Sequence, residues 1–291
     1  RVARAGGQEL QTVLRRNEND RWRVRIDGEF YPADSRRVEE FLGVLGELRG
    51  LRIAGSDQQY HREFDVTDNA ARVVELTDRA GSKLEHLLVG DVAAGGGRLY
   101  LREAGEEEVL VVHDDLAAYL DRGEAYWSDL RPLPEDLDPD SIMRISVDGN
   151  LRVDEETRMA DRYTVFRNSS DGESQWSVDT GSGNVDERLA GGRVDAYAAR
   201  LARVEAGAFV TEPPEGVGLE RPAVSIRFEN ESGREYVIQI GDRVGETRFY
   251  MRVRGPGVDT TEEGEPYLYT VSASRLEPLL RNRDELMPQD Q

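Results

Sequence analysis

Three histidines are the only imidazole groups with which this chain could perform acid–base chemistry near neutral pH or bind a metal. They are His61, His86 and His113, and they lie far apart in the sequence. His86 and His113 fall in apolar runs, LEHLLVG and EVLVVH, that are typical of strands. A matching pattern later in the chain has Ile238 and Val271 at the corresponding places. We therefore interpret the histidines as structural and predict no metal site among them.

An acidic stretch resembles the start of a calcium-binding loop. Asp136, Asp138 and Asp140 occupy alternate positions, as the first oxygen ligands of such a loop do. Ser141 stands where the loop needs a glycine for its turn, and Val147 stands where its bidentate glutamate belongs. We therefore interpret this stretch as the solvated surface of a linker.

Two glycine-rich stretches have the composition of phosphate-binding loops. The first contains Gly95, Gly96 and Gly97, and the second contains Gly181 and Gly183. The second lacks the final glycine of a dinucleotide fingerprint, and no Gly-Lys-Ser/Thr sequence follows either one. We predict that both are hairpin tips, and we predict no cofactor.

The sequence offers few nucleophiles. It has no cysteine, which excludes disulfides, thiolate metal sites and cysteine nucleophiles, and it has no Gly-x-Ser-x-Gly motif. A carboxylate pair for glycoside hydrolysis stays open, because the 58 acidic residues supply many candidates whose separation in space the sequence does not give. We predict no catalytic, cofactor-binding or metal-binding residue.

Charge and length restrict the partners and the organisation. The 291 residues indicate two domains, and the net charge of −20 argues against binding to nucleic acid or to an anionic lipid surface. No apolar run approaches the roughly 20 residues that span a bilayer. Because the sequence begins with Arg1 rather than Met, we expect that a signal or a membrane anchor has been removed.

Landmark residues recur in the same order in both halves of the chain. Trp22 and Trp176 are 154 residues apart, and Tyr100 and Tyr250 are 150 residues apart. The run IMRISVDG from Ile142 also matches RVARAGGQ at the start of the chain. We predict two tandem copies of one module.

The copies are predicted to occupy residues 1–138 and 139–291. A stretch with several prolines and acidic residues, at about 128–141, is predicted to join them as a solvated connection.

Each copy contains the same predicted elements. Apolar residues at helical spacing follow Asp34 or Ser35, one of which is the predicted N-cap, and recur from Val194 onward. Four short runs rich in Val, Ile, Leu, Tyr and Phe come next and predict an antiparallel meander. A short closing helix is predicted at 114–121 and at 272–282. The fold class is therefore α+β, with a mainly antiparallel sheet, an amphipathic helix packed on it and a short C-terminal helix.

The repeated aromatic residues are interpreted as core. A position kept in both copies is explained more simply by a shared packing need than by two identical sites. The repeated Gly-Asp pairs, at Gly90 and at Gly241, are interpreted as turns that close a strand.

Taken together, the landmarks resemble the domain of unknown function 4340. The features are a Trp after a short strand, a polar loop into a helix, a GL..P motif, an IGD motif, a strand with Tyr and a terminal amphipathic helix. The second half carries them as Gly218, Leu219, Pro222, Gly241, Asp242 and Tyr250. The first half keeps Trp22, Gly90, Asp91 and Tyr100, and has Phe64 and Ala70 or Ala71 where Leu and Pro are expected.

The resemblance implies a membrane-anchored protein with its repeats outside the cytoplasm, in the periplasm or at the cell surface. It implies no reaction and no catalytic residue. The resemblance also implies that some relatives accompany ABC transporters linked to gliding motility or surface export. We therefore expect a non-enzymatic binding or scaffold protein whose partner is a membrane transport complex. The alternatives are a surface-glycan binding protein, a carboxylate-dependent glycan hydrolase, and a purely structural spacer.

Overall fold

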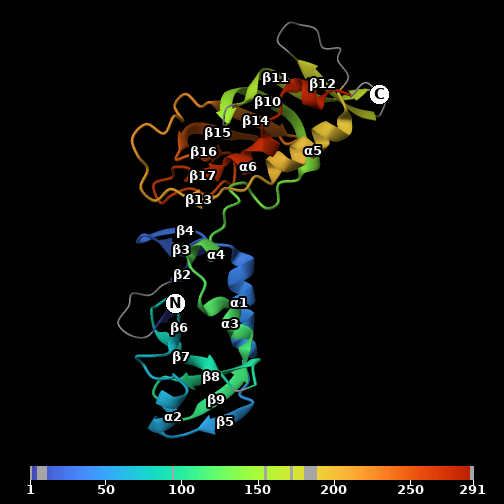
Figure 1. Ribbon diagram of the computed structural model, residues 1–291. Helices are drawn as coiled ribbons and strands as arrows, with labels where there is room; N and C mark the ends of the chain where they lie inside the picture. Colours follow the sequence, from blue (N-terminus) through green and yellow to red (C-terminus); the bar gives the residue numbers. More distant parts are fainter. Residues whose placement is uncertain are drawn as a thin grey trace. The chain divides into compact units, whose positions relative to one another are not determined.

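The computed structural model describes residues 2–4, 12–93, 95–153, 156–170, 173–179 and 189–288 (Figure 1). The chain divides into two compact units, Arg1–Asp129 and Leu130–Gln291. Both units consist mainly of antiparallel strands with a few helices, which confirms the predicted α+β class.

The first unit contains a large and a small antiparallel sheet. The large sheet has six strands in the order β1-β6-β7-β8-β9-β5, and the small one has the order β2-β3-β4. The strands are β1 Val2–Arg4, β2 Leu14–Arg16, β3 Trp22–Ile26, β4 Glu29–Pro32, β5 Arg52–Gly55, β6 Arg72–Thr77, β7 Lys83–Val92, β8 Arg98–Glu103 and β9 Val109–His113. The helices are α1 Ser35–Glu47, α2 Gln58–Glu63, the 3-10 turn η1 Asp114–Leu116, α3 Ala117–Leu120 and α4 Glu124–Trp127.

Helix α1 starts where the sequence predicts. The Asp34 side chain accepts a hydrogen bond from the backbone N–H of Arg37 at 3.2 Å, which satisfies one of the unpaired donors of the first turn. Val38 and Phe41 are buried in the core of the unit. Phe41 meets the indole of Trp127, with 5.5 Å between ring centroids, so α4 is held against α1 by aromatic packing.

The opposite face of the six-stranded sheet carries a cover that the sequence analysis did not predict. Helix α2 and the residues after it lie on this face, where the Phe64 ring stacks on Tyr100 with 4.0 Å between centroids. Val66 and Ala71 of the same segment are fully buried. Both faces of this sheet are therefore packed.

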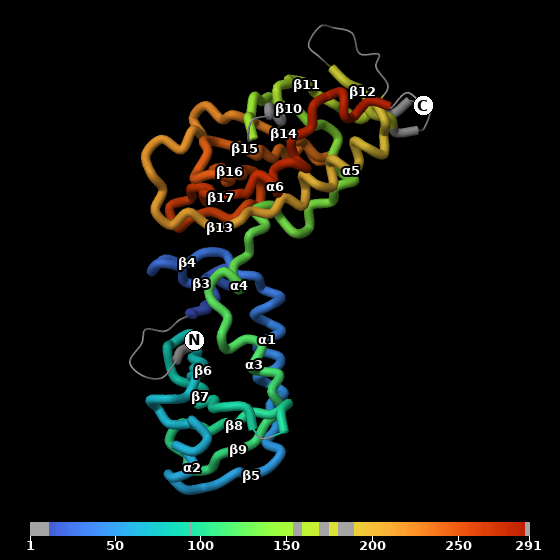
Figure 2. The backbone as a smooth tube through the Cα atoms, in the orientation of Figure 1, coloured from blue at the N-terminus to red at the C-terminus, as the bar shows by residue number. Residues whose placement is uncertain are grey.

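The second unit is built on one eight-stranded antiparallel sheet in the order β12-β11-β10-β14-β15-β16-β17-β13 (Figure 2). Its strands are β10 Ile142–Val153, β11 Glu156–Ser170, β12 Glu173–Asp179, β13 Ala208–Phe209, β14 Val224–Asn230, β15 Glu235–Val244, β16 Arg248–Arg254 and β17 Leu268–Ser272. Its helices are α5 Gly191–Ala202 and α6 Ala273–Leu276, with 3-10 turns η2 Pro139–Ser141, η3 Glu277–Leu279 and η4 Arg283–Leu286.

Strict alternation along these strands sends one set of side chains into the core. Ile145, Ile226, Ile238 and Met251 are all at most 1% exposed and belong to the face on which α5 and α6 pack (Figure 1). Residues between them point to the other face, and most of them are polar or charged, although Val237 is apolar. The sheet thus has one apolar, covered face and one polar face.

The two large sheets share an order of strands. In the first unit β1 pairs with β6 and the meander runs to β9, with β5 at the edge. In the second unit β10 pairs with β14 and the meander runs to β17, with β13 at the edge. The strands before the long helix differ, because β2, β3 and β4 form a sheet of their own whereas β11 and β12 extend the sheet of β10.

The Gly-Asp pairs are not turns, which corrects that prediction. Gly90 lies inside β7 and Gly241 lies inside β15, each at a shift in register. The backbone N–H groups of Asp91 and Asp242 donate to the carbonyls of Phe64 and Val217, at 3.3 Å and 2.9 Å. Glycine is needed because a crossing segment lies against the strand at this point.

The same contacts change the expected match between the halves. Val66 packs on Gly90 as Leu219 packs on Gly241. The structure therefore aligns Val66, two residues after Phe64, with Leu219.

The stretch at 128–141 is only partly solvated. Ser128 and Leu133 are 6% exposed, and the Leu130 carbonyl accepts from the backbone N–H of Ala206 at 2.8 Å. Apolar residues between the prolines find packing partners that the composition of the stretch did not reveal.

Substitution of either strand glycine should disrupt its unit. A Cβ at Gly241 would lie 2.2 Å from the Val217 carbonyl oxygen, and one at Gly90 would lie 1.9 Å from that of Phe64. We expect Gly90→Ala and Gly241→Ala each to lower the free energy of unfolding by about 3 kcal/mol, because the crossing backbone must move. The measurement is chemical denaturation.

Gly43→Ala is the matched control. Gly43 lies in α1 with open space around it, so alanine should raise stability by about 0.5–1 kcal/mol through helix propensity. Equal effects at the three positions would contradict the assignment of a close backbone approach.

Candidate functional site

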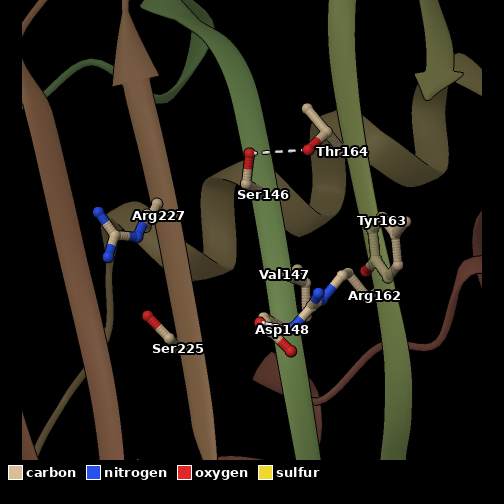
Figure 3. Close-up of a pocket in the computed structure, with 8 residues that line it drawn as sticks. All are labelled: Ser146, Val147, Asp148, Arg162, Tyr163, Thr164, Ser225 and Arg227. Carbon is tan, nitrogen blue, oxygen red and sulfur yellow. Dashed lines mark hydrogen bonds and ion pairs between the residues drawn. The ribbon is translucent and has the colours of Figure 1, made fainter. Parts of the chain in front are cut away.

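A hollow of about 360 Å³ lies on the polar face of the eight-stranded sheet, over β10, β11 and β14 (Figure 3). Its residues come from neighbouring strands and are brought together by the register. The lining consists of Ser146, Val147, Asp148, Arg162, Tyr163, Thr164, Ser225 and Arg227.

Alternation along the strands explains which of these residues face the hollow. Ser146 and Asp148 lie on either side of buried Val147, and they pair across the strands with Thr164 and Arg162. The Ser146 and Thr164 hydroxyls are 2.9 Å apart and share a hydrogen bond, drawn in Figure 3. Arg162 donates to the Asp148 carboxylate at 2.5 Å.

The row of Asp148 continues across the sheet. Asp148 pairs with Ser225, Ser225 with Gln239, and Gln239 with Arg252, so these side chains lie on one face in adjacent strands. Within the described part of the chain, Ser225 Oγ, Gln239 Oε1 and Arg252 Nε are buried and have no hydrogen-bond partner. Most buried polar atoms in folded proteins are satisfied, so three in one row mark this face as incomplete.

The balance of charge on this face is positive, although the chain has a net charge of −20. Asp148 is already paired with Arg162. Arg227, with 58% of its side chain exposed, has only a loose contact with Glu235, at 3.7 Å. Arg252 adds a third cation two strands away from Arg227. An anionic group would meet favourable charge here.

The lining of the hollow supplies hydroxyl groups and charged side chains. Asp148 is the single carboxylate among its lining residues, and it is held in an ion pair. The hydroxyls of Ser146 and Thr164 face one another rather than a base. The lining therefore offers hydrogen bonds and positive charge, without the carboxylate pair that glycoside hydrolysis requires.

Two buried tyrosines support the sheet beneath the hollow. The Tyr163 hydroxyl donates to the Arg281 carbonyl at 2.6 Å, and the Tyr197 hydroxyl of α5 donates to the Leu279 carbonyl at 3.0 Å. Burial raises the pKa of both hydroxyls above the usual value, and the neighbouring Tyr197 adds to the rise at Tyr163. Both remain protonated donors at neutral pH.

The three histidines lie in different places of the first unit. His61 is in α2, with its Nε2 2.9 Å from the Glu107 carbonyl. His86 is in β7 beside Lys83, and His113 ends β9 with its side chain exposed. Across the described residues, no group of three or more His, Asp or Glu side chains is placed to hold a metal ion.

The acidic stretch and the glycines occupy turns. Asp138 caps the 3-10 turn η2 by accepting from the backbone N–H of Asp140 at 3.0 Å, while Asp136 is exposed. Gly95, Gly96 and Gly97 have positive φ angles in the connection between β7 and β8, which fits the predicted hairpin tip. Gly181 and Gly183 lie outside the described residues.

The repeated aromatic residues are packed to different extents. Trp176 is 4% exposed, and its Nε1 donates to Asp195 of α5 at 2.8 Å, so it is a core residue as predicted. Trp22 is half-buried against the core of its own unit. Tyr100 and Tyr250 are half-buried on the second face of their sheets.

Sequence reasoning did not find the residues of the polar face. The available signal was the polar half of each alternating run, such as Ser225 and Arg227 in VSIRF. That pattern is shared by every ordinary solvated strand face, so it does not identify a site.

Comparisons with known proteins give a family and nothing more specific. The model of the domain of unknown function family DUF4340 matches residues 22–216. The match begins at Trp22 and ends before Gly218, so it extends from the first unit into the second. No curated protein and no solved structure matches the chain. None of the helices among the described residues has the length and apolar character needed to cross a membrane.

The tyrosines beneath the hollow predict how stability depends on alkaline pH. The folded state keeps Tyr163 protonated, whereas the unfolded chain releases this proton at about pH 10. The contribution of Tyr163 is therefore complete below pH 10 and is lost as the pH rises above it. We expect the melting temperature of the second unit to fall above about pH 10.

Tyr163→Phe should separate the two effects. At pH 8 it should lower the free energy of unfolding by about 1–2 kcal/mol, because the Arg281 carbonyl loses its donor. Above pH 10 the variant should lose stability less steeply than the wild type. Calorimetry over this pH range measures both, and parallel pH profiles would contradict the prediction.

Proposed function

We propose that this chain, which belongs to the DUF4340 family, is a non-enzymatic binding protein whose second unit contacts a protein partner through the polar face of its sheet. The partner is a membrane transport complex, and the chain is the extracytoplasmic part of an anchored accessory protein to an ABC-type transport or gliding and export system. This assignment to a complex rests on the family resemblance.

The observation that supports a binding role is the incomplete polar face. Ser225, Gln239 and Arg252 place three unsatisfied polar atoms in one row beside the hollow. These three atoms are covered by the chain itself, whereas the Arg227 side chain on the same face is 58% exposed and can contact a partner. The lining offers no acid–base pair that would turn binding into catalysis.

In this proposal the two units are copies of one module. They differ in the residues that cover the sheet face opposite the long helix. Their large sheets share the order of the paired strands, and a glycine in the second strand of each meander accepts a crossing segment. In the first unit Phe64 and Val66 help to pack this face, and in the second unit it stays open over β10, β11 and β14. One copy then serves as a support and the other as a contact surface.

Glycan binding is the second candidate function. The hydroxyls of Ser146 and Thr164 and the Arg227 guanidinium are groups that also bind sugars. Asp148 alone does not supply the two carboxylates of a hydrolase, so this candidate is a binding protein as well.

The proposed function predicts that the polar face is needed for association with the membrane complex. The full-length gene, tagged at its C-terminus and expressed in its own host, should be recovered from membranes together with transporter subunits. Arg227→Glu should reduce this recovery at least fivefold, because it reverses an exposed charge on the face.

Arg234→Glu is the matched control, since Arg234 is exposed in the turn between β14 and β15. It should leave the recovery within twofold of the wild type. Recovery of the wild-type protein without any membrane complex would contradict the proposed function and would favour the glycan candidate.

A further inference from the structure

Arg102 and Arg252 occupy the same place in their sheets. Arg102 in β8 and Arg252 in β16 each stand two residues after the recurring tyrosine. Each of these strands pairs with the strand that contains the Gly-Asp pair, β7 or β15. Arg102 pairs with Leu88, and Arg252 pairs with Gln239. Leu88 and Gln239 each stand two residues before the glycine of their strand. Each arginine therefore lies on the same face of the sheet as that glycine.

In the first unit the arginine is fully engaged. Arg102 is 6% exposed, and its Nε donates to the Val66 carbonyl at 2.9 Å. Its Nη2 contacts the Asp68 carboxylate at 3.3 Å, and its Nη1 donates to the Glu106 carbonyl at 3.1 Å. The segment at 66–68 thus supplies one backbone carbonyl and one carboxylate to the guanidinium.

In the second unit the crossing segment does not supply these acceptors. Leu219 packs on Gly241 as Val66 packs on Gly90, but two residues further along stands Arg221 instead of an aspartate. An arginine side chain cannot accept a hydrogen bond. The counterpart of the contact between Asp68 and Nη2 is therefore missing, and the buried Nε of Arg252 also has no acceptor among the described residues.

We infer that the polar face of the second unit binds an extended acidic peptide segment of the partner protein, which places a carboxylate and a backbone carbonyl on Arg252. The inference rests on the proposed function and adds the kind of segment that is recognised. The segment takes the role that residues 66–68 play for Arg102.

The charges around Arg252 favour a carboxylate. Arg254 is on the same strand and face, and Arg227 lies across β15 on the same face, since Val237 pairs with both. Strands are about 4.8 Å apart, so Arg227 of β14 and Arg254 of β16 are spaced by about 10 Å on either side of Val237. The nearby carboxylates of Asp148 and Glu235 lie against Arg162 and Arg227, respectively. A peptide has donors, carbonyls and a carboxylate together, and the first unit shows these groups in place.

The probe is a synthetic peptide of residues 64–70, FDVTDNA, with blocked ends, titrated into the purified chain by calorimetry. We expect millimolar binding that weakens at least fivefold when Asp68 of the peptide is replaced by asparagine. Equal affinity of the acidic and amide peptides, or no binding of the acidic one, would overturn the inference.

Arg252→Gln should weaken binding of the peptide about tenfold, since it removes a charge-assisted hydrogen bond. Arg248→Gln is the matched control, because it removes the same charge from the exposed start of the same strand and should change affinity less than twofold. Equal losses in both variants would show general charge attraction and would overturn the site.

Gln239→Glu tests the site without depending on Arg252→Gln being folded. It places a carboxylate beside Arg252 within the chain itself, because the two residues pair across β15 and β16. We expect a melting temperature higher by about 1–3 °C and loss of peptide binding. A lower melting temperature together with unchanged peptide binding would overturn the inference.

Failure of this inference can be told apart from failure of the proposed function. If Arg227→Glu abolishes recovery of the membrane complex but no acidic peptide binds, the face contacts a partner of other chemistry and the inference is wrong. If D-glucuronate binds more tightly than the peptide and depends on Arg252, the ligand is an acidic sugar and the inference is wrong.

Discussion

The close contact between a strand glycine and a crossing backbone segment is the constraint on which both units depend. At Gly90 and at Gly241 a carbonyl oxygen of a distant segment lies where any Cβ would be. The next residue's N–H donates to that same carbonyl, so the strand is locally paired to the segment as well as to its neighbours. The contact fixes where the crossing segment lies on the second face of the sheet, and therefore which part of that face stays open.

The crossing segments lie at the same place in the two units, but their side chains make different contacts with the sheet. In the first unit it brings Phe64 onto Tyr100 and Asp68 onto Arg102, so the face is packed and its buried cation is satisfied. In the second unit the same contact is made by Val217 and Leu219. The polar row of Ser225, Gln239 and Arg252 then lies beside the segment without the groups that would complete it.

The fold class could be predicted from the sequence because hydrophobic periodicity is a local property. The N-cap at Asp34 and the helical spacing from Val38 and from Val194 gave α1 and α5, and the alternating runs gave the meanders. Helix α2 was not predicted, because it is short and none of its residues is buried, so it has no amphipathic repeat. The Gly-Asp pairs were read as turns because a single chain does not reveal which distant backbone lies against them.

The polar face could not be predicted for a related reason. Its residues are the outward half of ordinary strands, and only the register brings Ser225, Gln239 and Arg252 into one row. Arg102 and Arg252 look equivalent in the sequence. The Nε of Arg102 has a hydrogen-bond acceptor and the Nε of Arg252 has none among the described residues. The sequence around the arginines does not reveal this, because the crossing segments stand about 35 residues upstream. Arg221 stands two residues after Leu219, whereas Asp68 stands two residues after Val66, so the second unit lacks at this position the carboxylate that contacts Arg102 in the first. Arg252 has no such carboxylate within the described residues, and in the proposed function a partner's carboxylate takes that place.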